Sequence, residues 1–219
     1  MLNLVGVDSP AFYNAKGNIQ KTDGAESVDI PPLALRIDRQ NLKIESESVL
    51  AAADSDGSFS NFTVGTDYYV YACQPAEGVE PDFILSVNST YPSSMPSGET
   101  PNADNTRKIG GFHYGRIRTG NNAGDVSEGI VPNSVWDMVN RPKCSPEGMA
   151  KVGNIWVDIY LASEDGQGGL ESAYDATPAT GTEGLSWYNF AEKAAKVDKR
   201  LLSMSEWIQA AKGSPQGND

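Results

Sequence analysis

Residues 185–213 constrain the fold of this chain most, because they have the pattern of two short helices joined by a basic elbow. Ser186 occupies the N-cap position of the first helix, where its hydroxyl can accept from unpaired backbone N–H groups. Lys196, Lys199 and Arg200 fall near the end of this helix, where cations interact favourably with the helix dipole. Apolar residues at helical spacing predict one apolar face, made by Trp187, Phe190, Ala191, Ala194 and Ala195.

The second helix carries a complete start signal. Ser203 and Glu206 form an S-x-x-E capping box, and Leu202 and Trp207 stand at the two positions of a hydrophobic staple. Gly213 is the predicted residue after its C-cap. The pattern predicts a buried face made by Trp207, Ile208 and Ala211.

Turn-forming residues dominate the chain before residue 185, which favours β structure there. The 219 residues include 22 Gly and 13 Pro. An alternation predicts one strand through Leu33, Leu35 and Ile37, after the Pro31–Pro32 break. Between residues 41 and 132 the strand candidates are LKIESESVLAAA, FSNFTVG, DYYVYACQ, DFILSVNS and RKIGGFHYGRIR, which together predict an antiparallel sandwich.

The clearest strand covers residues 68–73. It places Tyr69, Tyr71 and Cys73 on one face and Tyr68, Val70 and Ala72 on the other. We expect long polar loops at residues 88–105 and 119–129. Further along, SVWDMV at residues 134–139 is a short apolar segment, a strand is predicted through Ile155, Val157 and Ile159, and a Gly-rich loop is expected at residues 163–184.

Composition excludes several classes of function. A net charge of −12 argues against a nucleic-acid backbone as partner. No window approaches the apolar length that spans a bilayer, and residues 1–7 lack the features of a signal peptide, so we expect synthesis in a host cytoplasm and no membrane insertion. Cys73 and Cys144 are expected to be buried free thiols, with a bridge between them as the alternative.

Candidate chemistry is sparse. His113, the only histidine, has no nucleophile motif near it and is expected to pack within a strand. The acidic turns at residues 54–57 and 164–166 lack the full spacing of a calcium loop. We therefore predict no catalytic residue, no cofactor and no metal.

The paired-helix pattern resembles the signature of the formylglycine-generating-enzyme type of C-type lectin fold. The matching residues are Ser186, Trp187, Ala191, Lys199, Arg200, Leu201, Ser203, Glu206, Trp207, Ala210, Ala211, Lys212 and Gly213. Upstream segments resemble one branch of that superfamily, the phage major tropism determinants and related variable proteins of diversity-generating retroelements. These segments are residues 65–73, 107–115, 134–142, 146–161 and 172–175.

The resemblance implies a mainly β fold with an α+β C-terminal part. It implies an N-terminal β attachment or trimerisation segment at residues 1–45, a β-sandwich-like domain at 46–132, and half of a C-type lectin-like domain with two helices at 133–219. In the family the chain continues past the second helix, so we expect the variable C-terminal half to be lacking here.

Nine residues are predicted to serve as structural or family-motif positions. Arg141, Arg200 and the adjacent Lys199 are expected to pair with Asp137 or Asp158 at the edge of the lectin-like core. The full set is Trp136, Arg141, Trp156, Asp158, Trp187, Arg200, Ser203, Glu206 and Trp207.

By resemblance, the chain is expected to be a virion component, a phage tail-fibre or tail-tip protein that attaches to a bacterial surface receptor, either protein or glycan. A homotrimer in contact with other tail or baseplate proteins is the expected assembly. The alternative is a structural baseplate or fibre-adaptor protein without receptor contact. An oxidative enzyme of the formylglycine-generating group is disfavoured, because it needs a redox-active cysteine pair downstream of the helices and neither Cys73 nor Cys144 is placed there.

Overall fold

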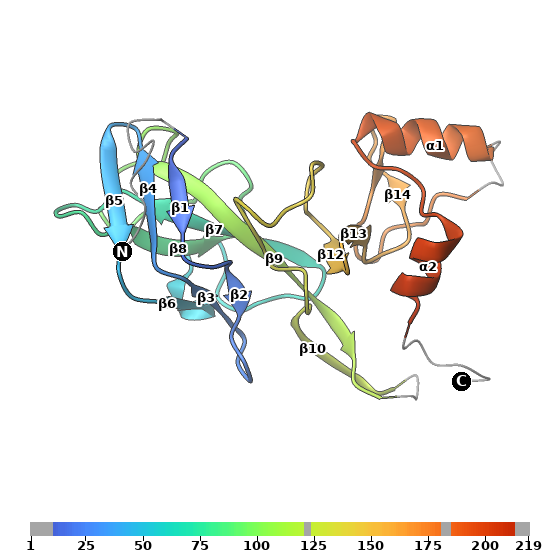
Figure 1. The fold of residues 1–219 in the computed structure, drawn as a ribbon, viewed down its shortest axis with the longest axis horizontal. Coiled ribbons are helices and arrows are strands. Elements are labelled where there is room, and N and C mark those ends of the chain that lie inside the picture. Colours follow the sequence, from blue (N-terminus) through green and yellow to red (C-terminus); the bar gives the residue numbers. More distant parts are fainter. Residues whose placement is uncertain (1–10, 121–123, 181–184, 213–219) are drawn as a thin grey trace.

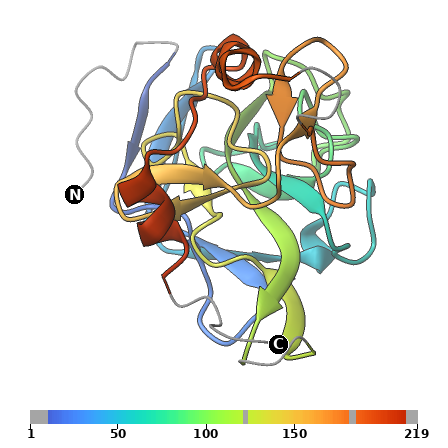
Figure 2. The same ribbon diagram turned by 90° about the vertical axis from the view of Figure 1, so that its right-hand side faces the viewer.

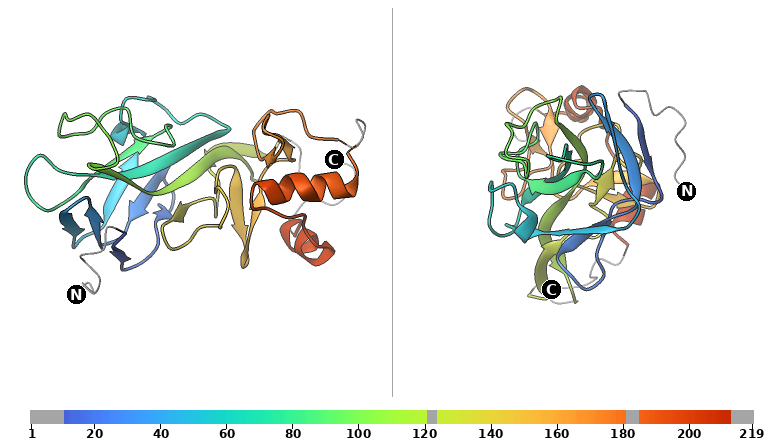
Figure 3. Two further views of the ribbon diagram at one scale, coloured as in Figure 1. Left: turned by 90° about the horizontal axis from the view of Figure 1, so that it is seen from above. Right: turned by 90° about the vertical axis from the view of Figure 1, so that its left-hand side faces the viewer.

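The computed structural model describes residues 11–120, 124–180 and 185–212. These residues form an elongated molecule with a β-rich end that contains strands β1 to β8 and a helical end that contains β12 to α2 (Figure 1). The long strand β9 runs obliquely between the two ends (Figures 1 and 3).

Two small antiparallel sheets build the first part of the β-rich end. One has the order β1-β4-β5 and the other the order β2-β3-β6, which is followed by a 3-10 turn at Ala52–Asp54. Leu33 and Leu35 of β4 lie opposite Ile44 and Leu42 of β5, which confirms the strand predicted from their alternation. The bounds are β1 Tyr13–Ala15, β2 Gln20–Lys21, β3 Ser27–Ile30, β4 Leu33–Ile37, β5 Gln40–Ile44 and β6 Ser48–Ala51.

A five-stranded antiparallel sheet forms the centre of the molecule. Its order is β10-β9-β7-β8, and β11 also pairs with β9. The bounds are β7 Thr66–Cys73, β8 Asp82–Ser86, β9 Thr106–Arg118, β10 Val126–Ile130 and β11 Trp136–Asp137. At 13 residues, β9 is long enough to pair with β7, β10 and β11 along different parts of its length.

Strand β7 separates two apolar clusters, as its alternation predicts. Tyr68, Val70 and Ala72 join the larger cluster, which includes side chains of the two small sheets. Tyr69, Tyr71 and Cys73 face the opposite way and pack with Ile84, Met95 and Trp136. The central sheet is therefore covered on both faces, as in a sandwich.

The members of the larger cluster come from many separate positions between Ile19 and Val135. Leu42 and Ile44, just before residue 45, contribute to the same cluster as Tyr68 and Phe112 after it. The proposed division into segments 1–45, 46–132 and 133–219 stays a prediction. Residues 1–10, the start of the proposed attachment segment, lie outside the described residues.

The helical end consists of two short hairpins and two helices, seen end-on in Figure 2. The hairpins are β12 Met149–Val152 with β13 Ile155–Asp158, and β14 Ser163–Glu164 with β15 Leu170–Glu171. The helices are α1 Trp187–Lys196 and α2 Met204–Ala210. Both begin as predicted, at Ser186 and Ser203, because the two capping boxes are formed.

Three local predictions were wrong. Residues 59–65 form turns and bends, because Phe59 and Phe62 pack their rings against Tyr68 from a loop. The expected loop at 119–129 is shortened by β10, whose backbone pairs with β9 although its first three residues, Val126, Ser127 and Glu128, are exposed. The Gly-rich stretch after residue 163 contains the β14–β15 hairpin.

The predicted buried face of α2 was also wrong. Trp207 is 58% exposed and Ile208 is 62% exposed, and Ala211 is half-buried. Gly213, the predicted residue after the C-cap, lies outside the described residues, and the helix is capped at Ala211. Among the described residues, no helix is long and apolar enough to cross a membrane.

Candidate interaction surface

The two helices expose most of their large apolar side chains. In α1, Trp187 is 66% exposed and Tyr188 is 77% exposed, and their rings meet edge to face with centroids 5.3 Å apart. We call the whole set the apolar helix residues: Trp187, Tyr188, Leu202, Met204, Trp207 and Ile208. A concentration of exposed aromatic and aliphatic groups within some twenty residues is typical of a surface that contacts another protein segment.

Local capping contacts hold each helix in shape. Ser186 accepts from the backbone N–H of Asn189, and the Asn189 side chain accepts from the Ser186 backbone N–H at 2.9 Å. Ser203 and Glu206 make the same reciprocal pair at the start of α2. Arg200 donates to the Glu206 carboxylate at 2.8 Å, and this hydrogen bond holds the pKa of Glu206 well below its usual range. The predicted motif residues Arg200, Ser203 and Glu206 are thus brought together on the surface.

A salt bridge attaches the elbow between the two helices to the β12–β13 hairpin. Lys199 donates to Asp158 at 2.7 Å, and their side chains are 12% and 25% exposed. Gly153 in the β12–β13 turn leaves room for Gln209 of α2, since a Cβ there would lie 2.2 Å from the Gln209 amide nitrogen. The elbow and α2 therefore contact the β12–β13 hairpin, whereas α1 contacts the β14–β15 hairpin, where Lys193 pairs with Glu164 at 3.1 Å.

The two tryptophans outside the helices are, in contrast, buried or half-buried. Trp136 is 4% exposed and packs on Gly111 of β9, where a Cβ would lie 2.9 Å from the indole ring. Trp156 on β13 is half-buried and packs against the same cluster. The Arg141 guanidinium lies 6.0 Å from the centre of the Trp136 ring, a cation–π contact.

The expected charge pairs are thus formed in one case of three. Lys199 pairs with Asp158, whereas Arg200 pairs with Glu206 and Arg141 lies over Trp136. The structure brings Trp136, Arg141 and Trp156 to one place and leaves Trp187 and Trp207 on the outside.

Asp137 has a role that sequence patterns do not show. It is fully buried, and its carboxylate accepts from the backbone N–H groups of Ile19 at 2.9 Å and of Val139 and Asn140 at 2.7 Å. The bond to Ile19 joins positions 118 residues apart. Asp137 of β11 therefore holds Ile19, just before β2, against the segment of residues 132–140.

A buried polar network around His113 joins the central sheet to the helical end. The His113 ring meets Asp67 through Nδ1 at 3.0 Å and the Tyr160 hydroxyl through Nε2 at 2.8 Å. Because a carboxylate only accepts, Nδ1 carries the donated proton. Asp67 also accepts from the backbone N–H of Gly148, whose carbonyl accepts from the Ser172 hydroxyl. This packing role agrees with the interpretation of His113 as structural.

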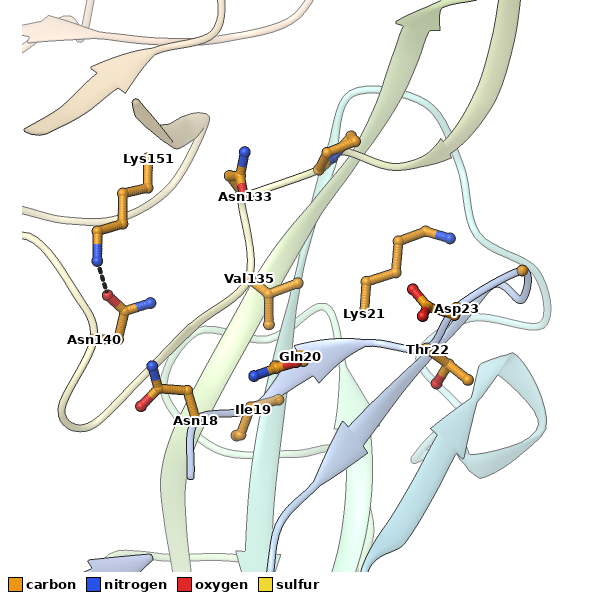
Figure 4. A pocket seen from close by; sticks show the side chains of 12 residues that line it. Asn18, Ile19, Gln20, Lys21, Thr22, Asp23, Asn133, Val135, Asn140 and Lys151 are labelled. Carbon is orange, nitrogen blue, oxygen red and sulfur yellow. Dashed lines mark hydrogen bonds between the residues drawn. The ribbon is translucent and has the colours of Figure 1, made fainter. Parts of the chain in front are cut away.

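One open pocket of about 540 Å³ lies between the β2 strand region and the segment after β10 (Figure 4). Its lining comes from residues 18–24, from residues 132–140 and from Lys151 of β12. In Figure 4 the side chain of Val135 lies between those of Asn133 and Gln20, and the side chain of Ile19 lies beside that of Asn18. No sequence motif marks these residues, because they come from three separate stretches.

Across residues 11–120, 124–180 and 185–212, no group of three or more His, Cys, Asp or Glu residues could hold a metal ion. Cys73 and Cys144 are both free, Cys73 buried and Cys144 half-buried, and burial raises the pKa of each thiol.

Comparison with known proteins agrees with this architecture. Residues 34–137 match the family model described as the Mtd second domain. The chain is 30% identical over 196 residues to the tail fiber receptor-binding protein of Bordetella phage BPP-1, an alignment that covers 80% of this chain and 49% of that protein.

Solved structures of two variants of the major tropism determinant share the fold. The P3c variant superposes with a TM-score of 0.62 at 25% identity and covers 92% of this chain and 53% of its own length. The U1 variant gives the same TM-score and identity and covers 91% and 52%. The chain spans about half the length of these relatives, and the predicted mainly β fold with two C-terminal helices is confirmed. Residues 34–137 therefore carry the second domain of the major tropism determinant family, and over most of its length the chain shares the fold of these phage proteins.

Proposed function

We propose that this chain is a scaffold component of a phage tail-fibre protein that attaches the virion to a receptor on the bacterial surface. The observation that carries the proposal is the 30% identity, over 80% of this chain, to a protein named as a tail fiber receptor-binding protein. The fold supports it, because a rigid β core with buried polar cross-links presents exposed loops and helices in fixed positions.

The proposal assigns binding, with no catalytic step. Both relatives for which structures are matched are named as tropism determinants, and the relative from Bordetella phage BPP-1 is named as a receptor-binding protein. We further propose a homotrimer within the virion, in which several weak receptor contacts add up to firm adhesion. Motif residues such as Trp136 and Asp158 would act by holding the scaffold together, and not by touching the receptor.

Adsorption to cells tests the receptor-binding role. The purified, fluorescently labelled chain is incubated with a panel of bacterial strains, and bound fluorescence is measured by flow cytometry with and without excess unlabelled chain. We expect saturable, competable binding to some strains and none to others. Equal binding to all strains, or binding to none, would argue against direct receptor contact by this chain.

A structural adaptor role is the second candidate, favoured by the exposed apolar helix residues, which suit contact with another protein segment. Affinity capture from a phage lysate separates the two roles. Recovery of tail or baseplate proteins without adsorption to cells would favour the adaptor.

Light scattering tests the assembly. A trimer would have three times the chain mass of 23.4 kDa, whereas a monomer would contradict the proposed homotrimer.

A further inference from the structure

The pocket beside β2 has walls that are fixed by hydrogen bonds from distant parts of the chain (Figure 4). Ile19 at its base donates its backbone N–H to buried Asp137 at 2.9 Å. On the opposite wall, the backbone N–H of Lys151 donates to the Asn133 carbonyl at 2.8 Å, and its ammonium donates to the Asn140 side chain at 2.6 Å. The pocket is therefore preformed, as small-molecule sites generally are.

Three amide side chains at this pocket have unused hydrogen-bonding capacity. Asn18, Gln20 and Asn133 are exposed, and their side chains make no hydrogen bond within the part of the chain that the structure describes. Asn133 is also held at a φ of 62°, a left-handed conformation that fixes where its side chain projects. An amide offers both a donor and an acceptor, which matches a ligand hydroxyl that also does both.

The base of the pocket is aliphatic. Ile19 is 2% exposed and Val135 is 8% exposed, and the accessible parts of both side chains line the pocket among the amides. A flat C–H surface of a ligand can cover them while its hydroxyls reach the rim. Amides beside aliphatic groups are complementary to the two kinds of surface of a sugar ring.

The charges at the pocket argue against an anionic ligand. The Lys21 ammonium is engaged by Glu26 at 3.3 Å and by the Ala25 carbonyl at 2.8 Å, and the Lys151 ammonium is engaged by Asn140. Asp23 adds a negative charge at the rim. A phosphate or carboxylate would meet lysines that already have partners.

We propose that this pocket binds a neutral saccharide unit, with the amides of Asn18, Gln20 and Asn133 hydrogen-bonded to its hydroxyls and Ile19 and Val135 beneath its ring. A volume of about 540 Å³ lies within the usual range of ligand pockets and accommodates one or two sugar units. The proposal does not depend on the adhesion role, since it concerns the binding of free sugars to the isolated chain.

Saturation-transfer NMR with the intact chain tests the proposal. The probes are the methyl glycosides of glucose, galactose, mannose, rhamnose and N-acetylglucosamine, with glucose 6-phosphate as the anionic comparison. At about 10 mM each, millimolar dissociation constants are detectable. We expect transfer to at least one neutral glycoside, and little to the phosphate.

Variants locate the binding. In the double variant Asn18→Ala with Asn133→Gly, in which glycine retains the left-handed backbone, we expect affinity to fall at least about tenfold, the equivalent of losing one or two hydrogen bonds. Asn41→Ala removes an exposed amide on β5 outside the pocket and should leave affinity unchanged. Gln20→Ala serves as a second test if the double variant fails to fold, which circular dichroism would show.

The NMR experiment measures binding of free glycosides, whereas the adsorption assay measures binding to cells, so either experiment can fail while the other succeeds. Absence of transfer to every neutral glycoside would overturn the proposal. Binding that survives both Gln20→Ala and the double variant, or a preference for glucose 6-phosphate, would overturn it as well.

Discussion

Replacing Asp137 with alanine tests whether one buried carboxylate fastens the N-terminal strands to the rest of the core. The substitution leaves three backbone N–H groups without their acceptor, those of Ile19, Val139 and Asn140. The Ile19 group is buried, so its loss of a partner costs about 1–3 kcal/mol of folding free energy. The other two are only partly buried and can reach water, which limits their cost to about 0.5–1 kcal/mol each.

Removing a buried charge offsets part of this loss, so we expect Asp137→Ala to lower the free energy of unfolding by about 2–4 kcal/mol. Asp137→Asn keeps the shape and one acceptor oxygen but turns an amide donor towards a neighbouring N–H. We therefore expect it to cost about 1–3 kcal/mol. Asp104→Ala, at an exposed carboxylate, is the matched control and should change stability by less than about 0.5 kcal/mol.

Urea unfolding followed by fluorescence gives these free energies, and hydrogen exchange locates the effect. In Asp137→Asn we expect the Ile19 amide to lose protection before amides at the centre of β7. An Asp137→Ala midpoint equal to that of Asp104→Ala would refute the assigned role. Retained protection at Ile19 in a destabilised variant would place the loss elsewhere.

Three further predictions concern packing, thiols and acid stability. Gly111→Ala should cost about 1–3 kcal/mol in urea unfolding, because its Cβ would meet the Tyr68 carbonyl oxygen and the Trp136 indole, whereas Gly124→Ala, with open space around it, should be neutral. A thiol reagent at pH 8 should label Cys144 well before Cys73 in peptide mass spectrometry, because burial raises the pKa of Cys73 to about 12; equal rates would contradict this. Burial alone would raise the pKa of Asp56, but hydrogen bonds from nearby serines hold it below its ordinary value. Its ionised form therefore adds stability at neutral pH that is lost as the pH falls below about 4, and Asp56→Asn should be less stable at pH 7 with a shallower acid dependence in urea midpoints.

Local patterns were predictable from sequence because their physics is local. Ser203 and Glu206 are three residues apart, and the capping contacts that they form need nothing from the rest of the chain. The alternation in residues 68–73 likewise assigned each side chain to the correct face of β7. In both cases the relevant partners are specified by spacing alone.

Features that depend on distant residues were not predictable. Helical periodicity indicated that Trp207 and Ile208 share an apolar face, but periodicity does not say what covers that face, and here both are exposed. Nothing around Asp137 in the sequence reveals an acceptor for Ile19, 118 positions earlier. The pocket amides Asn18 and Asn133 are equally far apart and carry no shared motif.

The length and direction of β9 have a mechanical consequence. It extends obliquely along the long axis and pairs with β7 through eight residue positions, from Thr66 opposite Tyr114 to Cys73 opposite Thr106. Ladder hydrogen bonds run perpendicular to the strands, so tension along the axis would load this ladder in shear and strain many bonds at once. A protein built on such a strand would resist being pulled apart lengthwise far better than being peeled open from one edge.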